Sequence, residues 1–322
     1  MQTYFGAYAA KMHSSIWHAK LGHPAPLVLK KILQQLHVPC NIETLEFIDS
    51  CKLGNVHRLP FTRSQISTKE PLELVYSDIW GPAPFVSTQG FRYYIAFVDA
   101  FTRFTWMFPL KLKSDALGVF ITFQKYVELQ LGKMIKYLQT DMGREFLPFV
   151  PFLSKQGVKV RFSCAYTHAQ NGVVERKHRH LVETRLTLLA HARMPLTFWL
   201  EAFTTACFLV NNMPTALLQF KSPFEVLHKE APNYNFLHTF GCSVFPYLRD
   251  YSKIKLNFQT TKCVFIGYST MHKGYCCLHP SRKVFVTRHA EFNEREFPYT
   301  SIFPCTNSTS GSVLVQVPSK YY

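Results

Sequence analysis

The stretch LELVYSDI, residues 72–79, decides which fold this chain adopts. It is a short apolar run that carries one acid, Asp78, near its end. Two further runs, FRYYIAFVDA at 91–100 and RFTWMFPL at 103–110, are rich in aromatic and β-branched residues, which favour strands. A tight turn near Phe101–Arg103 separates them. The three stretches together predict neighbouring strands of one sheet.

Helical patterns follow these strands. One apolar set recurs at helical spacing and predicts a helix after the third strand: Leu117, Phe120, Ile121, Val127 and Leu131. The stretch KMIKYLQTD, 133–141, predicts another strand, which ends in Asp141. Two more helical zones cover about 173–193 and 196–213. Strands first, then helices with one more strand between them, predict an α/β layer fold around one sheet.

Composition divides the chain into four regions. Residues 1–62 form a small helical module, and 63–235 form the α/β core. Residues 236–296 contain short β-like runs separated by turn residues, a pattern typical of a small antiparallel barrel. Residues 297–322 are rich in Ser, Thr and Pro, and we expect a flexible tail there.

The charge of the chain indicates a polyanionic partner. Lys and Arg number 36 against 20 Asp and Glu, a formal net charge of +16. Basic side chains gain affinity for nucleic acid by releasing counterions from phosphates, although a merely soluble basic protein remains the alternative. The nine scattered cysteines do not suggest a disulfide framework, so we expect a reducing compartment. Because no signal peptide or membrane-length apolar run is visible, we expect an intracellular protein with no membrane partner.

Three acids occupy positions that suit metal-dependent chemistry. Asp78 and Asp141 end strands, and Glu175 begins a helix within AQNGVVERKHRH, 169–180. Mg²⁺ and Mn²⁺ require hard oxygen ligands, and phosphodiester chemistry commonly uses two such ions. An acid at a strand end, taken singly, is more often only a turn former. We interpret Asp99 in this way.

Several motifs in a fixed order resemble the integrase region of copia-type long-terminal-repeat retrotransposon polyproteins. They are PLELVYSDIWGP, IKYLQTDMGREF, QNGVVERKHRH, MPLTFWLEAF, SPFEVL and TRHAEFNE, and the resemblance covers about residues 17–297. It implies an RNase H-like integrase core with a mixed five-stranded sheet and helices. It also implies a GAG-pre-integrase, zinc-binding-like module before the core and a Src-homology-3-like β-barrel after it.

The resemblance also implies an activity. In that family an acidic triad, here Asp78, Asp141 and Glu175, binds Mg²⁺ or Mn²⁺ and joins the 3′ ends of element DNA to a target duplex. Such integrases work as multimers, so we expect self-association, and we expect nuclear and cytoplasmic localisation. Glu145 in the GREF segment is interpreted as a structural neighbour of the triad.

The basic run around Glu175 predicts DNA contacts. Asn171 forms a tight turn with Gly172, and three bases follow within the run: Arg176, Lys177 and Arg179. We expect these four residues to contact phosphates that flank the reacting one. A nuclear-import signal or a solvated helix face is the alternative for the same run.

A zinc site ahead of the core is expected to be incomplete. His18 and His23 in WHAKLGHP, followed by Cys51, match three ligands of the His-His-Cys-Cys module that the resemblance implies. Ile48 stands where the module has its first cysteine, and it cannot ligate a metal. Cys40 and Asp49 lack the spacing of the cysteine pair. The alternative is a helical appendage that folds by packing alone.

Two functions stay open at this stage. The first is a divalent-metal-dependent DNA integrase, a polynucleotidyl transferase that carries out 3′-end processing and strand transfer. The second is a degenerate or repurposed nucleic-acid-binding remnant without catalytic turnover. It is favoured by the missing cysteine and by the loop SCAYTHAQNG, 163–172, which lacks two prolines and a glutamine of the run that the resemblance implies. A stand-alone ribonuclease H is weakened by the two flanking modules. No protease or polymerase motif is visible, so we expect a fragment of a longer polyprotein.

Overall fold

The computed structural model describes residues 14–37, 51, 68–163, 171–248, 260–269 and 271–304. The predicted strands pair into one mixed sheet of order β3-β2-β1-β4-β5. Its strands are β1 (Leu74–Trp80), β2 (Tyr93–Asp99), β3 (Thr105–Leu110), β4 (Tyr137–Thr140) and β5 (Lys159–Phe162). β1 runs antiparallel to β2 and parallel to β4, which confirms the mixed five-stranded sheet.

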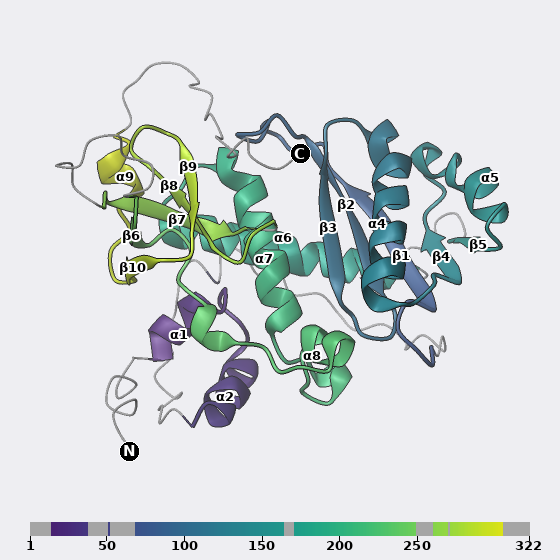
Figure 1. Ribbon diagram of the computed structural model, residues 1–322, viewed down its shortest axis with the longest axis horizontal. Helices are drawn as coiled ribbons and strands as arrows, with labels where there is room; N and C mark the ends of the chain where they lie inside the picture. Colours follow the sequence, from purple (N-terminus) through teal and green to yellow (C-terminus); the bar gives the residue numbers. More distant parts are fainter. Residues whose placement is uncertain are drawn as a thin grey trace.

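Helices cover both faces of this sheet (Figure 1). Those of the core are α4 (Ala116–Leu131), α5 (Phe149–Ser154), α6 (Gly172–Ala192), α7 (Trp199–Asn212) and α8 (Pro223–His228). Val75 and Ile79 of β1 enter a hydrophobic cluster with residues of α4 and α5. Leu74 and Tyr76 enter the cluster that contains α6 and α7. Because side chains alternate along a strand, Asp78 faces the same side as Tyr76, towards α6.

The turn between β2 and β3 is built around Asp99, which is fully buried. Its carboxylate accepts hydrogen bonds from the Leu72 N–H at 2.9 Å and from the N–H and hydroxyl of Thr102 at 2.9 and 2.6 Å. Burial raises the pKa of Asp99, against the effect of these hydrogen bonds. The three donors come from residues just before β1 and just after β2, at the same end of the sheet. The structure therefore supports the interpretation of Asp99 as a turn residue.

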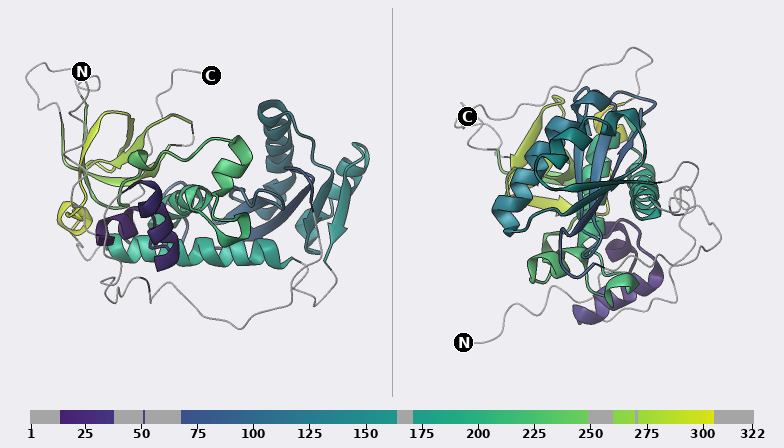
Figure 2. Two further views of the ribbon diagram at one scale, coloured as in Figure 1. Left: turned by 90° about the horizontal axis from the view of Figure 1, so that it is seen from below. Right: turned by 90° about the vertical axis from the view of Figure 1, so that its right-hand side faces the viewer.

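A second five-stranded sheet, entirely antiparallel, lies beyond the helices in the order β10-β6-β7-β8-β9. Its strands are β6 (Ser243–Pro246), β7 (Cys263–Tyr268), β8 (Tyr275–Leu278), β9 (Val284–Thr287) and β10 (Ala290–Asn293). Helix α7 contacts β7, and α6 extends from the first sheet to the second (Figure 2). The two sheets are therefore held by the same pair of helices.

The N-terminal module packs into this arrangement with α1 (Ser14–Lys20) and α2 (Pro26–Gln35). Trp17 and Leu29 belong to the hydrophobic cluster that also contains Val264 of the second sheet. An ion pair of 3.1 Å joins Lys20 Nζ to Glu294 Oε1, and both side chains are largely buried. The expected modules thus share one continuous core.

The folded chain continues past the expected start of the tail. Short helix α9 (Tyr299–Ile302) follows β10, and Phe297, Tyr299 and Phe303 pack against the main hydrophobic cluster. Residues 297–304 are therefore part of the fold, because their aromatic side chains bury against it. The remainder of the expected tail, 305–322, lies outside the described residues. None of the helices in the described ranges combines the length and apolarity that crossing a bilayer requires.

Candidate functional site

Asp78 and Asp141 are brought together by strand register. The parallel pairing of β1 with β4 matches Leu74 to Tyr137 and Tyr76 to Gln139. Two residues further in the same register, Asp78 stands beside Asp141, which directly follows the last residue of β4. Neighbouring strands lie about 4.7–4.9 Å apart, and in-register residues of parallel strands face the same side. The two carboxylates therefore project side by side towards α6.

Glu175 lies in the first turn of α6, on the helix that covers this face. Its N–H donates to the Asn171 carbonyl at 3.2 Å, and α6 contacts both β1 and β2. One turn later, His178 Nε2 lies 3.3 Å from Asp78 Oδ2. The start of α6 is thereby placed over the strand that carries Asp78, and all three predicted acids lie on one side of the sheet.

The negative charges near Asp141 are poorly compensated. Burial raises the pKa of Asp141, and the charges of Asp78 and Glu145 raise it further. The N–H of Gly143 donates to Asp141 Oδ1 at 3.1 Å and works in the opposite direction. Mutual repulsion of this kind is relieved when a cation binds. The oxygen donors and their charge therefore fit a divalent ion.

Glu145 was expected to be a structural neighbour of the triad, and its carboxylate lies close to that of Asp141. A side chain built on Gly143 would meet Asp141 Oδ1 and Glu145 Oε2 at 3.0 Å each, so these oxygens are separated by at most twice that distance. Lys113 Nζ pairs with Glu145 Oε1 at 2.7 Å. Burial alone would raise the pKa of Glu145, but the contacts with Lys113 lower it overall. Lys113 thus neutralises one acid at the rim of the site.

The carboxylates of Asp78, Asp141 and Glu175 do not converge to metal-ligand spacing. Among the described residues, one group of three potential metal ligands converges, and it is the one formed by His18, His23 and Cys51. Like charges repel, so two ionised carboxylates reach ligand spacing when a cation or a shared proton lies between them. The structure brings the acids to one side of the sheet without closing them around a common point.

The four residues expected to contact DNA are placed differently from one another. Arg176 is exposed and Arg179 is half-buried. Asn171 is only 2% exposed, because α6 begins there against the sheet, so it is not a surface contact. Lys177 is half-buried, and burial, together with the charge of Arg103, lowers the pKa of its ammonium to about 8.

His178 is a site residue that the sequence reasoning missed. The hydroxyl of Tyr94 lies 2.8 Å from its Nδ1, while Nε2 makes an electrostatic contact with Asp78 that is not aligned as a hydrogen bond. This matches the tautomer in which Tyr94 donates to Nδ1 and the ring proton on Nε2 faces Asp78. The spacing of three residues from Glu175, which places both side chains on neighbouring helical positions, is the signal that could have found it.

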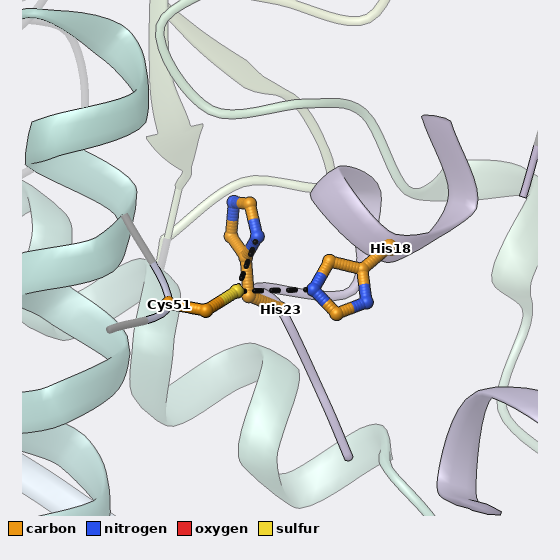
Figure 3. A group of neighbouring side chains, drawn as sticks. All are labelled: His18, His23 and Cys51. Carbon is orange, nitrogen blue, oxygen red and sulfur yellow. Dashed lines mark hydrogen bonds between the residues drawn. The ribbon is translucent and has the colours of Figure 1, made fainter. Parts of the chain in front are cut away.

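A second cluster lies in the N-terminal module (Figure 3). Cys51 Sγ lies 3.2 Å from His18 Nε2 and 3.3 Å from His23 Nδ1, and the three ligand atoms lie within 4.8 Å of one another. Burial lowers the pKa of His18 to about 4 and that of His23 to about 2, so both imidazoles are neutral at pH 7. Two neutral imidazoles and one thiol are a donor set that zinc accepts. The three residues singled out from the sequence therefore do meet.

Two family matches agree with these two sheets. The family described as integrase core domain matches residues 68–168, and the family described as retroviral polymerase SH3-like domain matches residues 242–305. The first contains the mixed sheet with Asp78 and Asp141, and the second contains the antiparallel sheet. Together they define the class of the protein, a retroviral-type integrase core followed by an SH3-like domain.

Curated relatives narrow the class to a family. Over 300 residues the chain is 40% identical to the retrovirus-related Pol polyproteins from transposons RE1 and RE2 of Arabidopsis thaliana, which covers 92% of this chain and 20% of each relative. It is 33% identical over 285 residues to the corresponding polyprotein from transposon TNT 1-94 of Nicotiana tabacum, covering 87% of this chain and 22% of that one. The chain thus spans about a fifth of the length of these relatives. It belongs to the integrase region of retrovirus-related Pol polyproteins of the copia type.

Solved integrase structures are more distant. The simian T-cell lymphotropic virus intasome in complex with PP2A regulatory subunit B56 gamma is 17% identical, covers 86% of this chain and 95% of that chain, and has a TM-score of 0.42. The HTLV-2 integrase catalytic core domain in complex with magnesium is 18% identical, covers 49% and 97%, and has a TM-score of 0.37. The fold assignment rests on strand order and on the two family matches.

Proposed function

We propose that this chain acts as a retrotransposon integrase that performs 3′-end processing and strand transfer of element DNA into target DNA. The observation that carries the proposal is the register that sets Asp78 beside Asp141 under the first turn of α6, where Glu175 lies. Membership of the integrase family supplies the reaction class. Mg²⁺ or Mn²⁺ is the cofactor that these oxygen donors favour.

Each residue of the site has a separate task in this reaction. Asp78 and Asp141, on neighbouring strands, and Glu175, on the helix, would hold the metal ions from two rigid elements. The Gly143 N–H keeps Asp141 oriented, and Lys113 keeps the charge of Glu145 paired. When bound, such ions activate the attacking oxygen and stabilise the leaving oxygen of a phosphodiester.

One assay decides between the two functions that the sequence left open. Purified protein is incubated with Mn²⁺, a short duplex with a recessed CA end and a plasmid, and joined product is followed on a gel. We expect product that requires the metal. Salt-sensitive DNA binding without product at any metal concentration would instead support the degenerate, DNA-binding remnant.

Arg176 and Lys177 should contribute unequally to DNA binding. Replacing the exposed Arg176 by Ala should weaken binding and lower the slope of log K against log salt by about 1, as loss of one phosphate contact does. Lys177→Ala should change the slope less, because the residue is half-buried and burial lowers the pKa of its ammonium to about 8. Fluorescence anisotropy at several salt concentrations measures both slopes. A larger change for Lys177 than for Arg176 would contradict the orientation of α6.

His178 should act as a positioning residue for Asp78. The variant His178→Ala removes the ring between Tyr94 and Asp78, and we expect the joining rate to fall about 10–100-fold, the usual effect of losing a partner of a metal ligand. The Mn²⁺ concentration for half-maximal joining should rise as well, which a purely structural defect would not cause. The exposed His272→Ala is the matched control. An unchanged metal requirement in His178→Ala would show that the contact has no role in catalysis.

The partners and location follow from this reaction. We propose that element ends and the target duplex are the DNA partners, that the chain self-associates on them, and that it acts in the nucleus after synthesis in the cytoplasm. The net charge of +16 suits such a polyanion. We propose further that the module 1–62, the core 63–235 and the barrel 236–296 jointly contact DNA.

A further inference from the structure

We propose that His191 is the fourth ligand of the zinc cluster and replaces the cysteine that Ile48 cannot supply. His191 lies in the last turn of α6, the helix that begins beside Glu175. If His191 binds the metal, the metal would link the N-terminal module directly to α6. The module would then depend on the core for its metal, and the cluster would not be an autonomous zinc finger.

Cys51 already stands at ligand spacing from both histidines. In a tetrahedral zinc site with Zn–S of about 2.3 Å and Zn–N of about 2.0–2.1 Å, sulfur and nitrogen ligands lie roughly 3.5 Å apart. The two distances from Cys51 Sγ, 3.2 and 3.3 Å, are within a few tenths of an ångström of that value. Structural zinc is almost always four-coordinate, so three donors leave one corner to be filled.

His191 is placed to fill that corner. Its ring packs edge-on against the His23 ring, with 4.9 Å between centroids and 66° between planes, while the rings of His18 and His23 are 4.8 Å apart. On its other side His191 meets the Phe297 ring at 4.7 Å. Its nitrogens are not part of the converging group of three, so ligation would require rotation about its side-chain bonds to bring a nitrogen to the ion.

Cys40 and Asp49, the alternatives nearer in sequence, lie outside the described residues. His191 lies on a 21-residue helix whose hydrophobic face is buried in the main core. The rigid helix keeps His191 beside the cluster, so only its side chain has to turn for ligation.

Cobalt binding tests the proposal without any use of DNA. The full chain, freed of metal, is titrated with Co²⁺, whose visible absorption reports four-coordinate geometry and thiolate ligation. We expect one tight site in the parent protein, and about 100-fold weaker binding with loss of the four-coordinate spectrum in His191→Ala. His191→Cys should restore tight binding and add a second thiolate-to-cobalt band. The exposed His289→Ala should behave like the parent.

Further variants separate ligation from packing. His191→Phe keeps a ring against Phe297 and His23 but has no donor, so it should lose the metal while retaining stability in the metal-free form. In an Ile48→Cys background, which supplies the missing thiolate, His191→Ala should no longer weaken binding. Each of these results depends on metal affinity alone and is independent of joining activity.

Four outcomes would overturn the assignment. The first is that the parent protein does not bind Co²⁺, and the second is that His191→Phe binds it as tightly as the parent. The third is that Cys40→Ser loses affinity while His191→Ala keeps it. The fourth is that His191→Cys shows no second thiolate band. The last result would make His191 an outer partner of His23, whose buried Nε2 has no hydrogen-bond partner among the described residues.

Discussion

We expect that replacing Asp141 by Asn abolishes DNA joining and leaves the protein at least as stable as the parent. Asn keeps the shape of the side chain and the oxygen that accepts from the Gly143 N–H at 3.1 Å. It removes the negative charge that would hold the metal beside Asp78. Losing a direct ligand should exceed the roughly 10–100-fold effect of losing an outer partner. We therefore expect no measurable product in the Mn²⁺ assay.

The stability of Asp141→Asn follows from the sign of the pKa shift. Burial and the charges of Asp78 and Glu145 raise the pKa of Asp141 in the folded state. A carboxyl with a raised pKa binds its proton more tightly when folded, so its charged form destabilises the fold above that pKa. The neutral Asn lacks this penalty. Its advantage in melting temperature over the parent should shrink as the pH falls through the raised pKa of Asp141.

Thermal melting and joining assays on the same preparations check this prediction. Asp115→Asn is the matched control, since Asp115 is an exposed acid at the start of α4 that accepts from the Leu112 N–H. The control should join DNA normally. An active Asp141→Asn protein would show that the acids do not share a catalytic ion. An inactive protein counts as evidence for metal ligation only if it is folded, and the melting curve shows whether it is.

Replacing Gly241 by Ala should separate the SH3-like domain from α6. Gly241 has φ of +81°, and a Cβ there would lie 2.2 Å from the Cβ and 3.1 Å from the Cα of Ala192, at the end of α6. Neither neighbour is a flexible side-chain end, so backbone must move. The left-handed backbone costs about 1–2 kcal/mol and overpacking about 1–3 kcal/mol, so we expect a loss of about 2–5 kcal/mol in the free energy of unfolding.

Gly90→Ala is the matched control for this substitution. Its φ of +86° is nearly the same, but a Cβ at Gly90 meets nothing within 4 Å. Denaturant titration should therefore show only the backbone cost of about 1–2 kcal/mol there. Ala192→Gly in the Gly241→Ala background should recover part of the loss by removing the clashing atom. Equal losses in Gly241→Ala and Gly90→Ala would show that the domain is not seated on α6.

Much of the fold could be predicted from local patterns. The runs at 72–79 and 91–110 predicted the strands because buried strands need apolar, β-branched and aromatic side chains whatever their partners are. The order of the motifs implied an integrase core followed by an SH3-like barrel, and the family matches confirm these two parts. The expected tail began too early, because the aromatic residues at 297–303 bury against a core that no local composition reveals.

The sequence singled out candidate site residues but did not reveal their surroundings. Strand-end positions singled out Asp78 and Asp141, and parallel pairing set them in register. The basic run predicted four DNA contacts, yet Asn171 is buried and Lys177 is half-buried. Counting charges along a helix cannot show which of its sides faces another element.

The sequence by itself indicated the strands and helices, since these depend on residue type and periodicity, and it singled out the three acids. The family resemblance added His18, His23 and Cys51 as expected zinc donors. Only the tertiary structure decided that His178 meets Asp78, that Lys20 pairs with Glu294, and that His191 lies against His23. Each of these contacts joins residues 100 or more positions apart. Such pairs meet through the packing of whole helices and sheets, and that packing is set by the sum of many apolar contacts and not by any single stretch of the chain.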